Sequence, residues 1–140
     1  ITVGCYDDLE SQYCKENCER YSGRGPQSTS LRKPDLVAPG TGIVSCNHAF
    51  ARIISKDYPG HNSDNTSNKT SYENLYIAKN GTSMATPIVT GCASLLLQKE
   101  PYLSNEKVKE RLTFSAQDLG KPWNFQGWGM INAKNLLEIN

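Results

Sequence analysis

The chain has 140 residues and a mass of 15.5 kDa, the length of one ordinary domain, which excludes a multi-domain arrangement. Fifteen basic and fourteen acidic residues give a formal net charge of +1, and no long block of one sign could follow a nucleic-acid backbone. The longest apolar stretch, residues 85–97, is shorter than the roughly 20 residues that cross a bilayer. We therefore expect neither a nucleic-acid partner nor a membrane partner.

The first part of the chain alternates short apolar runs with polar turns. Residues 1–6 have the pattern of a strand. The sequence opens directly on this pattern, without an initiator Met or a signal peptide, so we expect this chain to be part of a longer protein. Residues 7–19 are polar and predict a surface excursion, and residues 21–26 predict a tight turn. Residues 36–38 and 43–45 are typical of short buried strands.

The middle of the chain, about 46–79, loses this pattern and is rich in polar residues. We interpret it as a long, mobile loop inserted into the domain. From Asn80 onward the apolar residues return at helical spacing, and residues 84–97 are apolar on so many faces that we expect a helix buried nearly all round. Pro87 is expected near its first turn, where a missing N–H costs least.

Two more helices are predicted after this one. Ser104 is a typical N-cap for an amphipathic helix that runs through Val108, Leu112 and Phe114, and residues 132–139 suggest a last helix. No internal repeat is present in the sequence.

The five cysteines are an odd number, so they cannot all pair within one chain. Their spacing does not match a small secreted scaffold, which favours a reducing compartment such as the cytoplasm over secretion. Cys14 and Cys18 could hold a metal, but a structural zinc needs about four ligands and no second pair is placed to complete the set. We expect free thiols or one disulfide there, Cys92 as a small core residue, and no metal or cofactor.

The residues from 80 to 87 carry the strongest chemical signal. A glycine-led approach places Ser83 at the start of the apolar helix, where unpaired N–H groups and the positive end of the helix dipole favour an oxyanion. A serine hydroxyl needs a neighbouring base to become a nucleophile. The simpler interpretation is that Thr82 or Ser83 only caps the helix.

The sequence Gly-Thr-Ser-Met-Ala-Thr-Pro at residues 81–87 resembles the nucleophile motif of the subtilisin-like serine proteases. Three further segments resemble family motifs in the family's order. Residues 22–26 are similar to its Ser-Ser-Arg-Gly-Pro loop, with Gly23 as the one departure, and residues 33–40 to its Lys-Pro-Asp-Val-x-Ala-Pro-Gly segment. Residues 127–133 are similar to its C-terminal signature, so the resemblance runs almost from end to end.

The resemblance implies an α/β fold, a three-layer αβα sandwich around a parallel sheet, present only as its C-terminal part. It also implies a serine endopeptidase that hydrolyses protein or peptide substrates through an acyl-enzyme on Ser83. The backbone N–H of Ser83, helped by the side chain of Thr82, would be one donor to the oxyanion hole.

The family's Asp-Thr/Ser-Gly and His-Gly-Thr motifs and its oxyanion Asn are absent from this sequence. His48 and His61 lack the family's context and are expected to be ordinary loop residues. We therefore expect residues 1–140 to be the C-terminal portion of a catalytic domain whose N-terminal remainder supplies these groups. Alone, the chain is expected to be inactive. Its exposed apolar face and unpaired strand edge predict self-association, strand exchange or a retained partner fragment.

Two other functions are alternatives to a serine endopeptidase. An α/β-hydrolase requires Gly-x-Ser-x-Gly and a later His, but Ala85 occupies the place of the second Gly and no His follows His61. A catalytically dead family member that serves as a binding or regulatory module stays open, because Ser83 says nothing about the upstream Asp and His.

Overall fold

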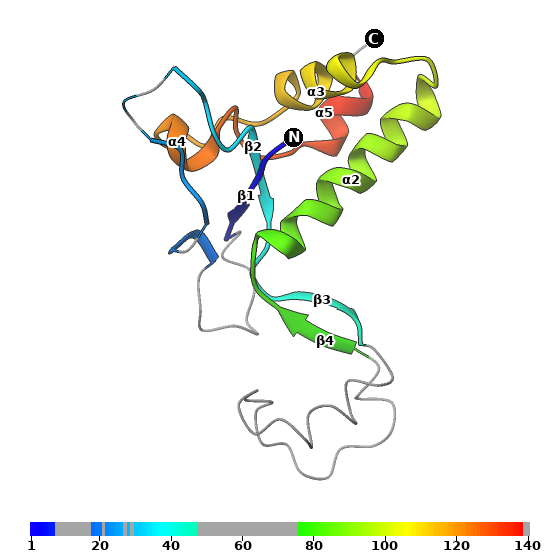
Figure 1. Cartoon of the computed structure of the whole chain (residues 1–140). Coiled ribbons are helices and arrows are strands. Elements are labelled where there is room, and N and C mark those ends of the chain that lie inside the picture. The colour runs from blue at the N-terminus through cyan, green and yellow to red at the C-terminus, as the bar shows by residue number, and fades with distance from the viewer. Residues whose placement is uncertain (8–17, 21, 27, 29, 48–75, 139–140) are drawn as a thin grey trace.

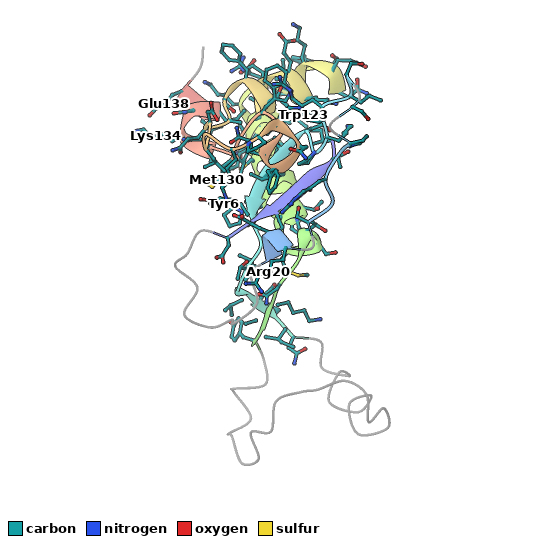
Figure 2. All side chains as sticks on the ribbon, turned by 90° about the vertical axis from the view of Figure 1, so that its left-hand side faces the viewer. Tyr6, Arg20, Trp123, Met130, Lys134 and Glu138 are labelled. Atoms are coloured by element: carbon teal, nitrogen blue, oxygen red, sulfur yellow. The ribbon has the colours of Figure 1, made fainter. Side chains whose placement is uncertain are left out.

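The computed structural model describes residues 1–7, 18–20, 22–26, 28, 30–47 and 76–138. Its strands are β1 (Val3–Tyr6), β2 (Leu36–Pro39), β3 (Ile43–Cys46) and β4 (Tyr76–Lys79). Its helices are the short 3-10 helix η1 (Cys18–Arg20), α2 (Thr82–Lys99), α3 (Asn105–Phe114), α4 (Trp123–Gln126) and α5 (Ala133–Glu138). Figure 1 and the turned view of Figure 2 place α2 on one face of the β1–β2 pair and α4 on the other. This layering confirms the expected αβα arrangement.

The central sheet is parallel. β1 pairs with β2, with Val3 opposite Leu36. On the far side of β2, Val37 forms a parallel bridge to Met130, and its N–H donates to the carbonyl of Gly129 at 2.9 Å. The expected strands in residues 1–6 and 36–38 are therefore confirmed, and the C-terminal signature adds a single bridged residue, Met130, beside them.

A second, antiparallel pair lies next to the start of α2. β3 pairs with β4, with Ile43 opposite Lys79 and Cys46 opposite Tyr76 (Figure 1). The expectation of loop throughout 46–79 is wrong at the end of that range, because Tyr76–Lys79 is a strand. Its side chains are all exposed, so it lacks the buried alternation that predicts a strand. Residues 48–75, which form most of the expected loop, lie outside the described residues.

Helix α2 buries one face against β1 and β2. Its buried residues recur at intervals of three and four: Ala85, Val89, Cys92 and Leu96. The expectation of burial all round is wrong for this chain, since the opposite side carries exposed hydroxyl residues and Leu95 is 47% exposed. The described elements cover only one side of the helix (Figure 1). Pro87 lies in the second turn, not the first, where it removes the N–H that would bond to the carbonyl of Ser83.

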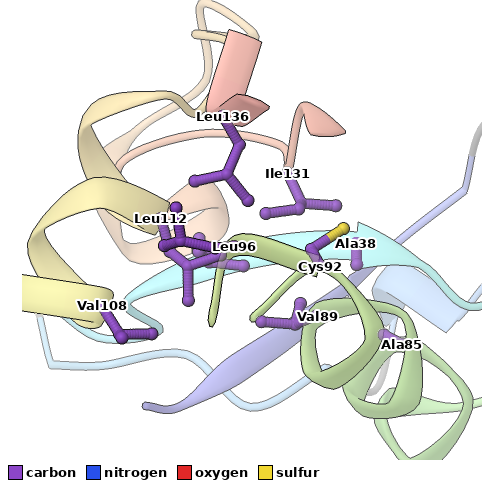
Figure 3. Packing of buried hydrophobic residues seen from close by; sticks show 10 residues of the cluster. Ala38, Ala85, Val89, Cys92, Leu96, Val108, Leu112, Ile131 and Leu136 are labelled. Carbon is purple, nitrogen blue, oxygen red and sulfur yellow. The ribbon is translucent and has the colours of Figure 1, made fainter. Parts of the chain in front are cut away.

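The hydrophobic core lies between α2, α3 and α5. The expected N-cap is confirmed, because the Ser104 hydroxyl accepts a hydrogen bond from the N–H of Lys107 at 3.3 Å. Phe114 is 79% exposed and is not part of the core. The last helix forms at Ala133–Glu138, close to the predicted range. Figure 3 shows the cluster, which comprises Leu36, Ala38, Ala85, Val89, Cys92, Leu96, Val108, Leu112, Ile131 and Leu136.

Candidate active site

Ser83 lies in the first turn of α2. The preceding Gly81 has φ 143°, a conformation that favours glycine, and its carbonyl accepts hydrogen bonds from Met84 at 2.9 Å and Ala85 at 3.3 Å. The N–H groups of Thr82 and Ser83 have no acceptor among the described residues. These are the orphan donors that a helix start leaves free, and they carry the positive end of the helix dipole.

The side chain of Ser83 is exposed, and its Oγ makes no hydrogen bond to any described residue. The N-cap position is occupied by Gly81, and no side chain caps the helix. The interpretation of Thr82 or Ser83 as a plain helix cap is therefore wrong. A hydroxyl that does no capping stands beside two free amides, which suits attack on a carbonyl whose oxygen then becomes negative.

Two hydrogen bonds hold the loop before Ser83 against the end of β2. The Gly81 N–H donates to the carbonyl of Gly40 at 2.8 Å, and the Gly42 N–H donates to Oδ1 of Asn80 at 2.6 Å. These contacts bring the segments 33–40 and 80–87, both singled out in the sequence, into direct contact. A Cβ on Gly40 would lie 2.7 Å from the carbonyl oxygen of Gly81, so only glycine permits this approach.

The loop at residues 22–26 is locked by its arginine. Nη2 of Arg24 donates to the carbonyl of Glu19 at 3.1 Å, and its guanidinium lies 3.5 Å from the centre of the Phe125 ring. Arg24 therefore has a structural role in this loop. The Ser22 hydroxyl also accepts from the N–H of Cys5 at 2.9 Å, which ties the loop to β1.

A buried carboxylate, not identified as a site from the sequence, holds the other end of the sheet. Asp35 is 4% exposed, and its carboxylate accepts from the Thr2 N–H at 2.7 Å and lies 2.9 Å from the ammonium groups of both Lys33 and Lys109. Burial by itself raises the pKa of Asp35, but these hydrogen bonds and charges outweigh it and lower the pKa to about 2. In the sequence, only the Lys-Pro-Asp segment at residues 33–35 could have pointed to this buried carboxylate.

The described residues do not include a histidine that could act as the base for Ser83. Both histidines, His48 and His61, lie outside the described residues. Among the residues that the structure describes, no three His, Cys, Asp or Glu side chains gather as a metal site. Within the same residues, no helix has both the length and the apolar character needed to span a bilayer.

Comparison with known proteins also indicates a subtilisin-like protease. A family model described as the subtilase family matches residues 1–129. The chain is 35% identical over 138 residues to serine protease AprX of Bacillus subtilis (strain 168), which covers 96% of this chain and 29% of that protein. It is 42% identical over 100 residues to subtilisin BL of Lederbergia lenta, covering 71% of this chain and 28% of that protein.

Solved structures show the same fold. Fervidolysin from Fervidobacterium pennivorans aligns with a TM-score of 0.69 at 24% identity, over 100% of this chain and 19% of that chain. The MycP3 protease of the type VII (ESX-3) secretion system aligns with a TM-score of 0.58 at 27% identity, over 100% of this chain and 32% of that chain. The chain thus spans less than a third of the length of these relatives. Since the family match covers nearly all of its residues, the chain belongs to the subtilase family of subtilisin-like serine proteases.

Proposed function

We propose that this chain supplies the nucleophile of a serine endopeptidase that cleaves protein or peptide substrates. The observation that carries the proposal is the exposed Ser83 hydroxyl at the start of α2, beside its own N–H, which has no acceptor within the described part of the chain. In the proposed reaction a base takes the hydroxyl proton while Oγ attacks the peptide carbonyl, giving an acyl-enzyme that water then hydrolyses. The Ser83 N–H, helped by the side chain of Thr82, donates to the oxyanion.

The base must come from elsewhere in the protein. The chain spans 29% of the length of AprX, and its sequence lacks the family's Asp, His and Asn motifs. We place these three groups in an N-terminal remainder of the same catalytic domain. Residues 1–140 alone hold a nucleophile without its base and are expected to be inactive.

Exposed apolar side chains on α2 support the same division of the domain. Leu95 and Leu97 are 47% and 38% exposed and flank the buried Leu96 on its two sides. Exposed apolar side chains on a core helix are typical of a contact surface for further protein. We propose that the N-terminal remainder covers them, and that the chain self-associates when the remainder is absent.

Labelling by a fluorophosphonate tests the proposal, because this probe reacts with a serine that is activated by a base. The full-length protein that contains this chain should be labelled, and Ser83→Ala should abolish the labelling. Ser94→Ala is the matched control, since Ser94 lies in the same helix with its hydroxyl bonded to the carbonyl of Thr90 at 3.0 Å, and it should leave labelling unchanged. A folded wild-type protein that resists the probe would instead indicate a binding or regulatory module.

A further inference from the structure

Asn80 and Gly81 form the only pair in the sequence in which an asparagine precedes a glycine. This pair is the one most prone to spontaneous deamidation, because glycine has no side chain to hinder the backbone nitrogen that attacks the asparagine amide. It lies directly before the helix that carries Ser83. The peptide cleavage proposed above does not use the side chain of Asn80 as a reacting group.

Two hydrogen bonds of the folded chain oppose this reaction. Deamidation requires the Gly81 nitrogen to lose its proton and attack Cγ of Asn80. The Gly81 N–H donates to the carbonyl of Gly40 at 2.8 Å, so loss of the proton would leave a negative nitrogen facing a carbonyl oxygen. Oδ1 of Asn80 accepts from the Gly42 N–H at 2.6 Å, which restrains the side-chain amide. The bond from Gly81 to Gly40 must therefore open before the pair can react.

The contact between Gly40 and Gly81 is close and is held from both sides. A Cβ built on Gly40 would lie 2.7 Å from the carbonyl oxygen of Gly81 and would overlap Sγ of Cys5. The N–H of Gly40 donates to the carbonyl of Tyr6, at the end of β1, at 3.1 Å. Gly40 is thus fixed between the central sheet and the loop that leads to α2, and only a glycine fits there.

We propose that Asn80 is a deamidation site which the contact between Gly40 and Gly81 protects in the folded protein, and whose modification displaces Ser83. When the contact opens, the Gly81 nitrogen forms a bond to Cγ of Asn80. Its proton passes through water to the side-chain nitrogen, which leaves as ammonia when its bond to Cγ breaks. Water then adds to either carbonyl of the resulting succinimide and breaks that carbon's bond to the ring nitrogen, leaving aspartate or isoaspartate.

The isoaspartate product changes the length of the backbone. The chain then continues through the former side chain of residue 80, which inserts one carbon–carbon bond of about 1.5 Å three residues before Ser83. The Gly81 N–H cannot then keep its bond to Gly40 while α2 begins at the same place. The protection of Asn80 depends only on the contacts described above. The consequence for Ser83 rests, in addition, on the proposed function.

Peptide mapping by mass spectrometry measures the deamidation rate of Asn80 while the full-length protein is incubated in mildly alkaline buffer. The reference is a synthetic peptide with the sequence of residues 76–86, which has no Gly40 to bond with. We expect Asn80 to react at least about tenfold more slowly in the folded protein than in the peptide. In protein unfolded by urea it should react as fast as in the peptide in the same urea. Equal rates in the folded protein and the peptide would overturn the proposal.

Two glycine variants test whether the contact is the source of the protection. Gly40→Ala forces the contact apart and should raise the rate at Asn80 by about tenfold. Gly23→Ala, where no atom lies within 4 Å of a Cβ, should leave the rate unchanged. A folded Gly40→Ala protein that reacts at the wild-type rate would contradict the proposal. The comparison with the peptide needs no variant, so it decides the matter if Gly40→Ala does not fold.

Fluorophosphonate labelling tests the consequence for Ser83. Full-length protein with isoaspartate at position 80, separated from the unmodified form by chromatography, should be labelled at least about tenfold more slowly. If both forms are labelled at the same rate, the displacement of Ser83 is overturned and the protection of Asn80 stands. If the unmodified form is not labelled at all, the proposed function fails, and the deamidation rates alone still decide whether the contact protects Asn80.

Discussion

Oδ1 of Asp35 lies 2.9 Å from Nζ of Lys109, so an ion pair joins the start of β2 to helix α3. The other carboxylate oxygen accepts from the N–H of Thr2 and from Lys33. A single buried carboxylate therefore connects the beginning of the chain, the Lys-Pro-Asp segment and a helix of the second half. The groups that face the carboxylate, the Thr2 N–H and the two ammonium groups, are all donors, so none of them can replace it as an acceptor.

Replacement of this carboxylate should be costly. Asp35→Asn removes the charge that two ammonium groups and a backbone N–H face, and we expect a loss of about 3 kcal/mol in the free energy of unfolding. Urea denaturation measures it. Glu110→Gln is the control, because Glu110 pairs with Lys107 in solvent at 62% and 61% side-chain exposure, and its loss should stay below about 0.5 kcal/mol. Equal effects of the two substitutions would contradict the role given to Asp35.

The same group predicts a dependence of stability on pH. Its pKa is about 2 in the folded chain against a usual 3.8, so the unfolded chain binds the proton first as the pH falls. The contribution of Asp35 is complete above pH 4 and is lost between about pH 4 and pH 2, with a size of about 2 kcal/mol. Denaturation curves at several pH values should show the difference between wild type and Asp35→Asn shrinking over this window. A constant difference would show that the pKa is not lowered.

Gly127 is expected to tolerate no side chain. Its φ is 62°, and a Cβ would overlap the carbonyl oxygens of Pro34 and Asp35. Gly127→Ala should lower the free energy of unfolding by roughly 3 kcal/mol, through the strained backbone and the collision together. Gly23→Ala is the comparison, since no atom lies within 4 Å of a Cβ there, and thermal denaturation should show it close to wild type. If both variants behaved alike, the close packing at Gly127 would be refuted.

Local patterns predicted much of this fold from sequence. The apolar runs predicted the strands β1, β2 and β3, and the Ser104 cap predicted the start of α3, because each depends on neighbouring residues. The expected burial of residues 43–45 is wrong, since β3 is largely exposed and Val44 is 55% exposed. Helix α4 was missed since its four residues, Trp123–Gln126, are too short to show a period. β4 was missed since its side chains are exposed and its partner β3 lies on the other side of the long polar segment.

Long-range contacts could not be derived from local pattern. The sequence singled out Ser83 and the segment 33–40 separately, and only the structure shows the hydrogen bond from Gly81 to Gly40 that joins them. The same applies to the ion pair of Asp35 with Lys109. The wrong expectation for α2 has a different cause. Its sequence is apolar enough for a helix buried on all sides, but the described elements cover only one of its faces.

Asn80 should position the nucleophile loop without acting chemically. Its Oδ1 accepts from the Gly42 N–H at 2.6 Å, and Asn80→Ala leaves that donor without its acceptor at a cost of about 1–3 kcal/mol. Asn80→Asp keeps an acceptor and should recover most of the loss. Urea denaturation together with amide exchange at Gly42 measures both effects. Equal destabilisation by Ala and Asp would rule out the hydrogen bond as the cause.

The exposed apolar side chains of α2 predict self-association of residues 1–140. Sedimentation equilibrium should detect oligomers at high concentration, and the double substitution Leu95→Gln and Leu97→Gln should weaken them by removing exposed apolar surface. Leu31→Gln, at a residue that is 67% exposed outside α2, should leave association unchanged. A wild-type chain that sediments as a compact monomer at high concentration would disprove this prediction.

Mapping the site of a covalent adduct shows whether Ser83 is the nucleophile. After reaction of the full-length protein with a fluorophosphonate, proteolytic digestion and fragmentation by mass spectrometry locate the modified side chain. We expect one phosphonylated residue, Ser83, at close to one adduct per molecule. An adduct on another serine with Ser83 unmodified, in a folded protein that cleaves peptides, would contradict the assignment of the nucleophile.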